Sequence, residues 1–193
     1  LLQVSAAMST YVIHISVDGF ASTYLEQYQA QGVLPNIARL RSEGASTVNA
    51  RADTDYTVTL PNHVSQLTSR PVVDKLGQQN GHAWITNNTP ALGETLHTNR
   101  GFYIPSVFDT VHDNGLSTSL FATKDKFILF ENSYNAANGA ADVTGTDNGT
   151  DKIDTYVNNE LDSASMLTTL LSNLQNSPTR YTFVHFHDAD TTG

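Results

Sequence analysis

The order of apolar and polar positions along the chain predicts strands that alternate with helices. Residues 11–17 form a β-branched apolar run that stops at Asp18-Gly19, which is the pattern of a strand followed by a tight turn. Runs at residues 117–123 and 180–186 predict two more strands. We therefore expect strands in the first, middle and last parts of the chain.

Between these strands, apolar residues recur at the three- and four-residue spacing of helices. Pro35 and Pro61 suit the first turn of a helix, and Gly32 and Gly44 follow helical stretches as stop signals. The predicted helices cover about residues 22–31 and 34–44, a stretch that begins just after Thr59, and residues 104–112 and 163–174.

Three further stretches lack helical spacing. Residues 46–50 resume an extended pattern, whereas residues 71–101 contain Gly, Asn and Pro at positions that interrupt any periodicity. Residues 138–148 are rich in Gly, Asp and Asn, which is typical of a surface insert. We expect the last two stretches to be loops.

Strands that alternate with helices of this length predict an α/β fold with a mostly parallel sheet covered on both faces. Such sheets place their functional sites beyond the carboxyl ends of their strands. Asp18 follows the first predicted strand, and Asp188 and Asp190 follow the last one. We therefore expect all three carboxylates at the same edge of the sheet.

Composition narrows the possible functions. The 193 residues carry a formal net charge of −9, with a pI near 5.0, and their ten Lys and Arg residues are scattered. This balance argues against binding to a nucleic-acid duplex, whose phosphates require clustered cations. Cysteine is absent, which excludes disulfides, a thiolate nucleophile and Cys-ligated zinc. An acidic protein can still act on small phosphate esters if a cation neutralises the site.

Residues 1–10 resemble the tail of a secretory segment. Val4-Ser5-Ala6 has the small residues of a cleavage site after an apolar start, although a disordered terminus would have the same composition. On this basis we expect an exported protein, periplasmic or secreted. No later segment approaches the ~20 apolar residues that span a bilayer, so no transmembrane segment is expected.

Thr59 and Asn62 are the strongest candidates for chemistry. A threonine hydroxyl is a poor nucleophile unless a base or a metal activates it, and no His or Lys is placed as an obvious base in the sequence. A metal held by carboxylates, together with the positive field at a helix start, would favour both an alkoxide and a bound phosphate. Asn62 could donate its amide to a phosphate oxygen. Taken singly, Thr59 would be a helix cap and Asp18 a turn residue.

Four segments together resemble a known family. Ser-Val-Asp-Gly-Phe at 16–20, Leu-Pro-Asn-Ile-Ala-Arg-Leu at 34–40, Thr-Leu-Pro-Asn-His at 59–63 and Asp-Ala-Asp-Thr-Thr-Gly at 188–193 are similar to the type I phosphodiesterase/nucleotide pyrophosphatase branch of the alkaline phosphatase superfamily. The resemblance implies an alkaline-phosphatase-like three-layer α/β/α fold. It also implies that residues 11–193 are the N-terminal portion of a single catalytic domain.

The resemblance implies a role for each matching residue. Thr59 would be the nucleophile, phosphorylated transiently, and would contact the zinc that Asp18 also ligates. Asn62 would hold the phosphate, and Asp190 would ligate a second zinc. The family's Asp-x-x-Gly turn continues into histidine ligands that these residues do not include. We therefore expect an incomplete site, with weak metal affinity and little turnover in this chain alone.

Other residues offer weaker sites, each with a structural alternative. His185 and His187 lie on one side of the last predicted strand and suggest either a metal site or packing. The stretch Asp142–Asp154 holds four aspartates that could bind calcium, but it lacks the spacing of the twelve-residue calcium loop. Trp84 could stack on a leaving group or anchor its loop.

The expected function is therefore metal-dependent hydrolysis of phosphodiester or pyrophosphate bonds in a small-molecule substrate. A phosphonate or phosphate-monoester hydrolase of the same superfamily and a non-catalytic binding protein on the same scaffold remain alternatives. Oxygen and imidazole ligands suit zinc but also manganese or iron. The oligomeric state stays open, because an exposed edge strand could pair with a second copy.

Overall fold

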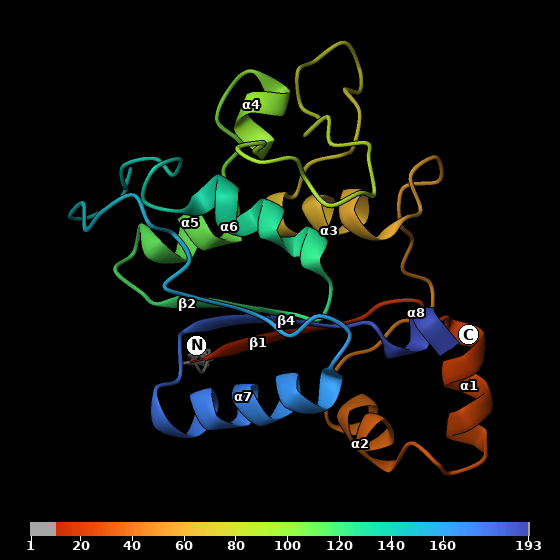
Figure 1. The fold of residues 1–193 in the computed structure, drawn as a ribbon. Coiled ribbons are helices and arrows are strands. Elements are labelled where there is room, and N and C mark those ends of the chain that lie inside the picture. Colours follow the sequence, from red (N-terminus) through yellow and green to blue (C-terminus); the bar gives the residue numbers. More distant parts are fainter. Residues whose placement is uncertain (1–10, 193) are drawn as a thin grey trace, which may run out of the picture.

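A computed structural model describes residues 11–192 as an α/β fold built on one parallel sheet. The four strands are β1 (Val12–Val17), β2 (Thr118–Ala122), β3 (Thr155–Asn158) and β4 (Tyr181–Phe186). They lie in the order β1-β4-β2-β3, and every neighbouring pair is parallel (Figure 1). The predicted fold class is confirmed.

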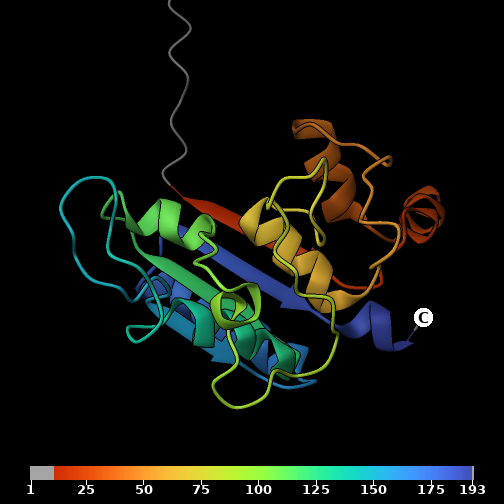
Figure 2. The ribbon, with the colours of Figure 1, turned by 90° about the horizontal axis from the view of Figure 1, so that it is seen from above.

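Helices cover both faces of the sheet, which makes three layers (Figures 1 and 2). The layer drawn above the sheet in Figure 1 contains α3 (Thr59–Thr68), α5 (Val107–His112) and α6 (Ile128–Tyr134), and α4 (Leu96–Arg100) lies farther out. On the opposite face α7 (Ser163–Asn176) packs against β2 and β4. The remaining helices are α1 (Ser22–Ala30), α2 (Pro35–Glu43), the short 3₁₀ helix η1 (Asp125–Phe127) and α8 (Asp188–Thr192).

The main hydrophobic core lies between the sheet and the upper layer. Leu60 and Leu67 of α3 pack there with Phe127 and with Phe183 of β4, and all four side chains are buried. A smaller cluster on the other face joins Phe121 and Val184 to Met166 and Leu170 of α7. The larger core thus fixes α3, and with it Thr59, against the sheet.

β1 forms one edge of the sheet and is less covered than the other strands. Ile13 and Ile15 are 46% and 57% exposed, whereas β2 is buried along its whole length. Helices α1 and α2 contain no buried residue. The part of the chain next to β1 is therefore held mainly by the β1–β4 pairing.

The structure departs from the sequence prediction in five places. The helix α4 was not predicted, because it is only five residues long and lies in the irregular stretch at residues 71–101. Residues 46–50 form no strand, so the prediction of an extended element there is wrong. The helix α6 and the strand β3 were not predicted, because the first is short and the second has only four half-buried residues. Asp188 and Asp190 lie in the helix α8 rather than in a simple turn.

The prediction of an export signal concerns residues that the structure does not describe. Val4-Ser5-Ala6 and the rest of residues 1–10 lie outside the described residues, so export stays a prediction. Within residues 11–192 no helix has the length and apolar character needed to cross a membrane.

Candidate active site

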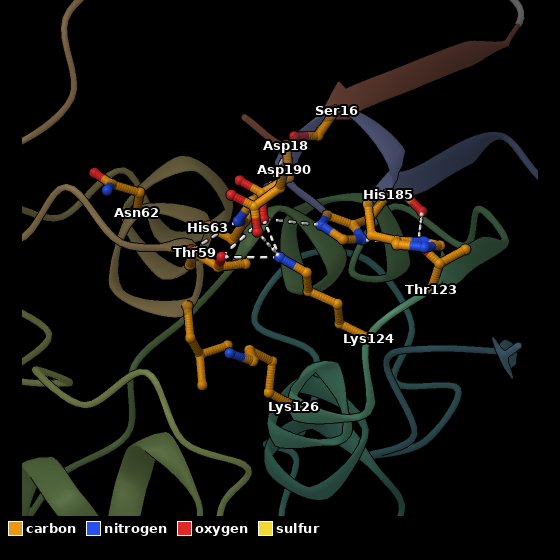
Figure 3. A network of polar contacts seen from close by, with 12 residues as sticks. Ser16, Asp18, Thr59, Asn62, His63, Thr123, Lys124, Lys126, His185 and Asp190 are labelled. Carbon is orange, nitrogen blue, oxygen red and sulfur yellow. Dashed lines mark hydrogen bonds and ion pairs between the residues drawn. The ribbon is translucent and has the colours of Figure 1, made fainter. Parts of the chain in front are cut away.

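Four side chains from separate segments meet beyond the carboxyl ends of β1, β2 and β4 (Figure 3). Asp18 follows β1, Thr59 is the first residue of α3, and Asp190 lies in α8 after β4. Lys124 follows β2 and points its ammonium group between them. Three of these residues were predicted from the sequence, and the structure brings them together.

The contacts among these groups are short. The Thr59 hydroxyl donates to Asp18 Oδ2 at 2.7 Å. The Lys124 ammonium donates to Asp18 Oδ2 at 2.7 Å and to Asp190 Oδ2 at 2.6 Å, and it lies 3.3 Å from Thr59 Oγ1. The Thr59 hydroxyl thus donates a hydrogen bond to the Asp18 carboxylate, and its oxygen accepts one from the Lys124 ammonium.

Gly19 allows Asp190 to approach Asp18. Its φ of +72° lies in the left-handed region that glycine adopts without strain. A Cβ at this position would lie 2.5 Å from the Asp190 Cα, closer than two carbon atoms can approach. Glycine at position 19 therefore serves two purposes. It allows the turn after β1, and its missing side chain leaves room for Asp190.

The surroundings keep both charges of the central pair in place. Burial alone would raise the pKa of Asp18, but hydrogen bonds from His185, Lys124 and Thr59 and the Lys124 charge outweigh it and hold the pKa well below its ordinary value. Burial likewise opposes the charge of Lys124, yet the two carboxylates raise the pKa of its ammonium above the usual value. Asp18 and Lys124 are therefore ionised across the neutral pH range.

The first turn of α3 brings a second asparagine to the site. The Leu60 N–H, which follows Thr59 at the start of the helix, donates to Asn87 Oδ1 at 2.9 Å. The Lys126 ammonium donates to the Asn87 carbonyl oxygen at 2.6 Å. The Asn87 side-chain amide nitrogen has no hydrogen-bond acceptor within residues 11–192, and its oxygen is bound to the residue that follows the nucleophile candidate.

Asn62 does not join this cluster. Its amide nitrogen donates to the Tyr56 carbonyl at 2.7 Å and to the Val58 carbonyl at 3.0 Å, and its Oδ1 accepts from the Asp53 N–H at 3.4 Å. In Figure 3 the side chain points away from the Thr59 hydroxyl. In this arrangement Asn62 holds the irregular segment before α3, and its amide is engaged there.

The two histidines of the last strand separate. His185 is fully buried, and its Nε2 lies 3.5 Å from Asp18 Oδ2. His187 lies after the end of β4, where its Nδ1 is 3.4 Å from Ser163 Oγ at the start of α7. The prediction that both point to one side of a strand is wrong, because the strand ends at Phe186 and the alternation ends with it.

Of the aspartates after residue 140, Asp142 contacts an ammonium group, and its N–H also lies 3.4 Å from Asp147 Oδ1. The fully buried Lys152 side chain pairs with Asp142 and lies 3.8 Å from Asp113 Oδ1. Asp154 does not take part in this ion pair; it accepts a hydrogen bond from the Thr118 N–H at 2.7 Å. The candidate calcium ligands are therefore engaged in separate contacts.

Trp84, which is 2% exposed, anchors its loop rather than lining a pocket.

The oxygen atoms of the cluster could hold a metal ion. Asp18 Oδ2, Asp190 Oδ2 and Thr59 Oγ1 already surround one positive charge, the Lys124 ammonium, so these three oxygens suit a single divalent cation. Within residues 11–192, no group of three or more His, Asp or Glu side chains is arranged to hold a metal ion. Asp18 and Asp190 share one centre here, whereas the resemblance assigned them to different zincs.

Sequence reasoning missed Lys124, Lys126 and Asn87. A signal for the lysines was present, because both follow the predicted strand at residues 117–123 and so belong to the same carboxyl edge as Asp18. Asn87 lies in the middle of a loop of thirty residues, where no local pattern distinguishes it. Its place became evident only from the contact with Leu60.

Comparison with known proteins assigns the chain to a family. A model of the family described as type I phosphodiesterase / nucleotide pyrophosphatase matches residues 12–193, which includes all the strands and the four residues of the cluster. Searches of curated proteins and of solved structures gave no match. The chain belongs to the type I phosphodiesterase / nucleotide pyrophosphatase family.

Proposed function

We propose that the protein hydrolyses phosphodiester or pyrophosphate bonds through a phospho-threonine intermediate at Thr59, with zinc in the site. Membership of the family supports a hydrolase of this general type. The observation that carries the finer proposal is the placement of the Thr59 hydroxyl. It lies at the start of α3, 2.7 Å from a carboxylate oxygen and 3.3 Å from an ammonium group.

The residues divide the chemistry as follows. Thr59 Oγ forms a bond to phosphorus while the bond to the leaving oxygen breaks, and the hydroxyl proton departs along the hydrogen bond to Asp18. The Lys124 ammonium and the positive field at the start of α3 stabilise the added negative charge. Water then attacks phosphorus, the bond to Thr59 Oγ breaks, and a proton of the water restores the hydroxyl. When zinc is bound, Asp18, Thr59 and Asp190 would hold it in the place that the Lys124 ammonium takes here, and it would supply Lewis-acid activation of the hydroxyl.

Asn87 supplies the phosphate-binding amide in this proposal. Its Oδ1 accepts from the N–H of Leu60, the residue after Thr59, which leaves the amide nitrogen without an intramolecular acceptor and so available to donate to a phosphate oxygen. The resemblance assigned this role to Asn62, whose amide is bonded to two backbone carbonyls. The position of the second zinc and of its histidine ligands stays a prediction.

The activity test uses the natural protein that contains these residues, supplied with zinc and a chromogenic phosphodiester. We expect hydrolysis that a chelator abolishes and that Thr59→Ala lowers by ~10³-fold or more, because the covalent nucleophile is lost. Thr59→Ser retains the hydroxyl and is the matched control. Activity that survives in Thr59→Ala would refute the phospho-threonine, and an inert wild type would favour a binding protein on this scaffold.

A second function, hydrolysis of a phosphate monoester or a phosphonate, is favoured by the lysine pair. Lys124 contacts the nucleophile, and the half-buried Lys126 donates to the carbonyl of Asn87, whose side chain binds the start of α3. Monoesters and phosphonates carry one more negative charge than a diester, which a second cation would favour. The ratio of kcat/KM for a monoester and a diester decides between the two. If the pair selects the monoester, Lys126→Met should lower that ratio about tenfold, whereas an unchanged ratio supports the diester.

A further inference from the structure

His63 connects the nucleophile candidate to the central sheet. It lies one helical turn after Thr59, and its Nδ1 is 2.7 Å from the Thr59 carbonyl oxygen. On the other side of the ring, Nε2 is 2.8 Å from Ser16 Oγ on β1. Figure 3 labels Ser16, His63 and Thr59 in this part of the site.

These contacts determine which ring nitrogen carries the proton. A carbonyl oxygen only accepts hydrogen bonds, so the Nδ1 of His63 must donate to Thr59. In the neutral ring Nε2 then has a lone pair, and the Ser16 hydroxyl donates to it. These two contacts leave the neutral ring one defined tautomer.

The position of Ser16 gives this chain of bonds a consequence for the site. Ser16 precedes Asp18 by two residues, so the strand that carries the Asp18 carboxylate also carries the hydroxyl that holds His63. Thr59 is thus attached to the β1 segment twice, once through its own hydroxyl to Asp18 and once through its carbonyl and His63. Two attachments restrict how the first turn of α3 can rotate.

The surroundings favour a fixed ring. His63 is 3% exposed, and the centroids of Phe127 and Phe183 lie 5.0 Å and 6.0 Å from its own, edge to face. Phenylalanine rings offer no competing hydrogen-bond partner. A buried histidine of the core would be satisfied by any polar neighbour, whereas this one bonds to the backbone of the residue that carries the reactive hydroxyl.

We propose that His63 is a positioning residue: its neutral, Nδ1-protonated ring and the Ser16 hydroxyl clamp the start of α3 so that Thr59 Oγ stays in line for attack. This inference rests on the proposed function. Because His63 does not contact the substrate, its loss should reduce kcat and leave KM nearly unchanged. A nucleophile displaced by about 1 Å is expected to react on the order of 10²-fold more slowly.

Two isosteric substitutions separate the two hydrogen bonds. The amide of Asn occupies the place of Nδ1, and the longer amide of Gln reaches the place of Nε2. We expect His63→Gln to lower kcat by about 10²-fold with KM within threefold of the wild type, and His63→Asn to restore at least a tenth of the wild-type kcat. Ser16→Ala should resemble His63→Asn. Equal kcat losses in Gln and Asn variants of equal thermal stability, or a wild-type kcat in His63→Gln, would overturn the proposal.

A ring ¹⁵N NMR spectrum tests the clamp without an activity assay. We expect the His63 signals of a ring protonated at Nδ1, with the Nε2 signal shifted in Ser16→Ala. A ring protonated at Nε2 would overturn the proposal whatever the enzyme does. An inert wild type would instead be a failure of the proposed hydrolysis, and an active wild type with an unaffected His63→Gln would be a failure of the clamp alone.

Discussion

At the scale of single residues, the two asparagines beside α3 differ in which of their polar groups are engaged. Asn62 uses both ends of its amide on the backbone of residues 53–58, whereas Asn87 uses its oxygen on the Leu60 N–H and keeps its nitrogen available. The residue type alone does not distinguish the two side chains. Their hydrogen-bond partners do, because an amide whose donors are already satisfied cannot readily bind a phosphate.

This difference predicts that only one of two alanine substitutions slows hydrolysis. Asn87→Ala should lower kcat/KM for a phosphate ester by about 10–10²-fold, because one donor to the phosphate is lost, and it should also lower stability, because the buried Leu60 N–H loses its acceptor. Asn62→Ala should lower the unfolding free energy by about 1–3 kcal/mol, because the Tyr56 and Val58 carbonyls lose their donor. Steady-state kinetics and urea unfolding of both variants check this. A kinetic effect confined to Asn62→Ala would restore the role that the resemblance assigned to it.

Among the elements, the segment at residues 138–149 is attached through one buried cation. The Lys152 ammonium contacts Asp142 and donates to the Gly149 carbonyl at 2.9 Å, and the Asp142 carboxylate also lies 3.0 Å from His112 Nδ1. Bonds from Lys152 and Asn148 hold the pKa of Asp142 well below its ordinary value. The Lys152 ammonium thus neutralises the Asp142 carboxylate, one of the aspartates that the sequence suggested as a calcium ligand.

Removal of this cation should be costly. In Lys152→Met the Asp142 carboxylate is left without its partner, and we expect a loss of about 3–5 kcal/mol in the free energy of unfolding. Lys75→Met, which removes an exposed ammonium 3.6 Å from Asp53, is the matched control and should cost less than about 1 kcal/mol. Thermal unfolding with calcium or with a chelator should give the same midpoint. A rise of the midpoint with calcium would show that the segment binds the ion after all.

The loop at residues 71–101 contains a histidine that links stability to pH. His82 is fully buried, accepts the Trp84 N–H at Nδ1 and bonds Ser65 through Nε2. Burial lowers the pKa of His82 to about 4, from 6.5 in the unfolded chain. Between these two values the unfolded chain binds a proton that the folded one does not, so stability is complete above pH 6.5 and falls as the pH drops towards 4.

We therefore expect the free energy of unfolding to decrease between pH 7 and pH 5, and the decrease to be smaller in His82→Gln. The Gln amide retains a donor for Ser65 but does not titrate. Urea unfolding at several pH values measures both slopes. Identical slopes in the two proteins would mean that His82 takes up its proton equally in both states.

At the scale of the whole molecule, β1 presents an apolar edge to solvent. Its outer edge has no partner strand within residues 11–192, and Ile13 and Ile15 are half exposed on one side. Unpaired edges of this kind tend to pair with another chain. We expect the 193-residue chain to self-associate as its concentration rises, and Ile15→Lys to suppress this.

Sedimentation velocity over a range of concentrations measures the association. Leu92→Lys, which places the same charge at a fully exposed position in the loop at residues 71–101, is the control and should associate like the wild type. A monomer at every concentration, or equal suppression by both substitutions, would exclude pairing through β1.

The sequence was sufficient to predict three strands of the sheet, but not to predict which residues of distant segments contact one another in the site. Apolar runs located β1, β2 and β4, and the rule about strand ends placed Asp18, Asp188 and Asp190 at one edge, whereas Thr59 was found from its motif at a helix start. Lys124 and Asn87 were missed, because their roles depend on contacts between segments up to 106 residues apart. Local pattern carries no information about such contacts until the strand order is known.

The central claim is that Thr59 carries the phosphoryl group during turnover. The most direct measurement is an acid quench during hydrolysis of a substrate labelled in its phosphoryl group, followed by peptide mapping. The account predicts label on the peptide that contains Thr59 and none in Thr59→Ala. Label on another residue would contradict it. So would steady turnover in which no label is found on the enzyme although transfer of the phosphoryl group to Thr59 is faster than its hydrolysis.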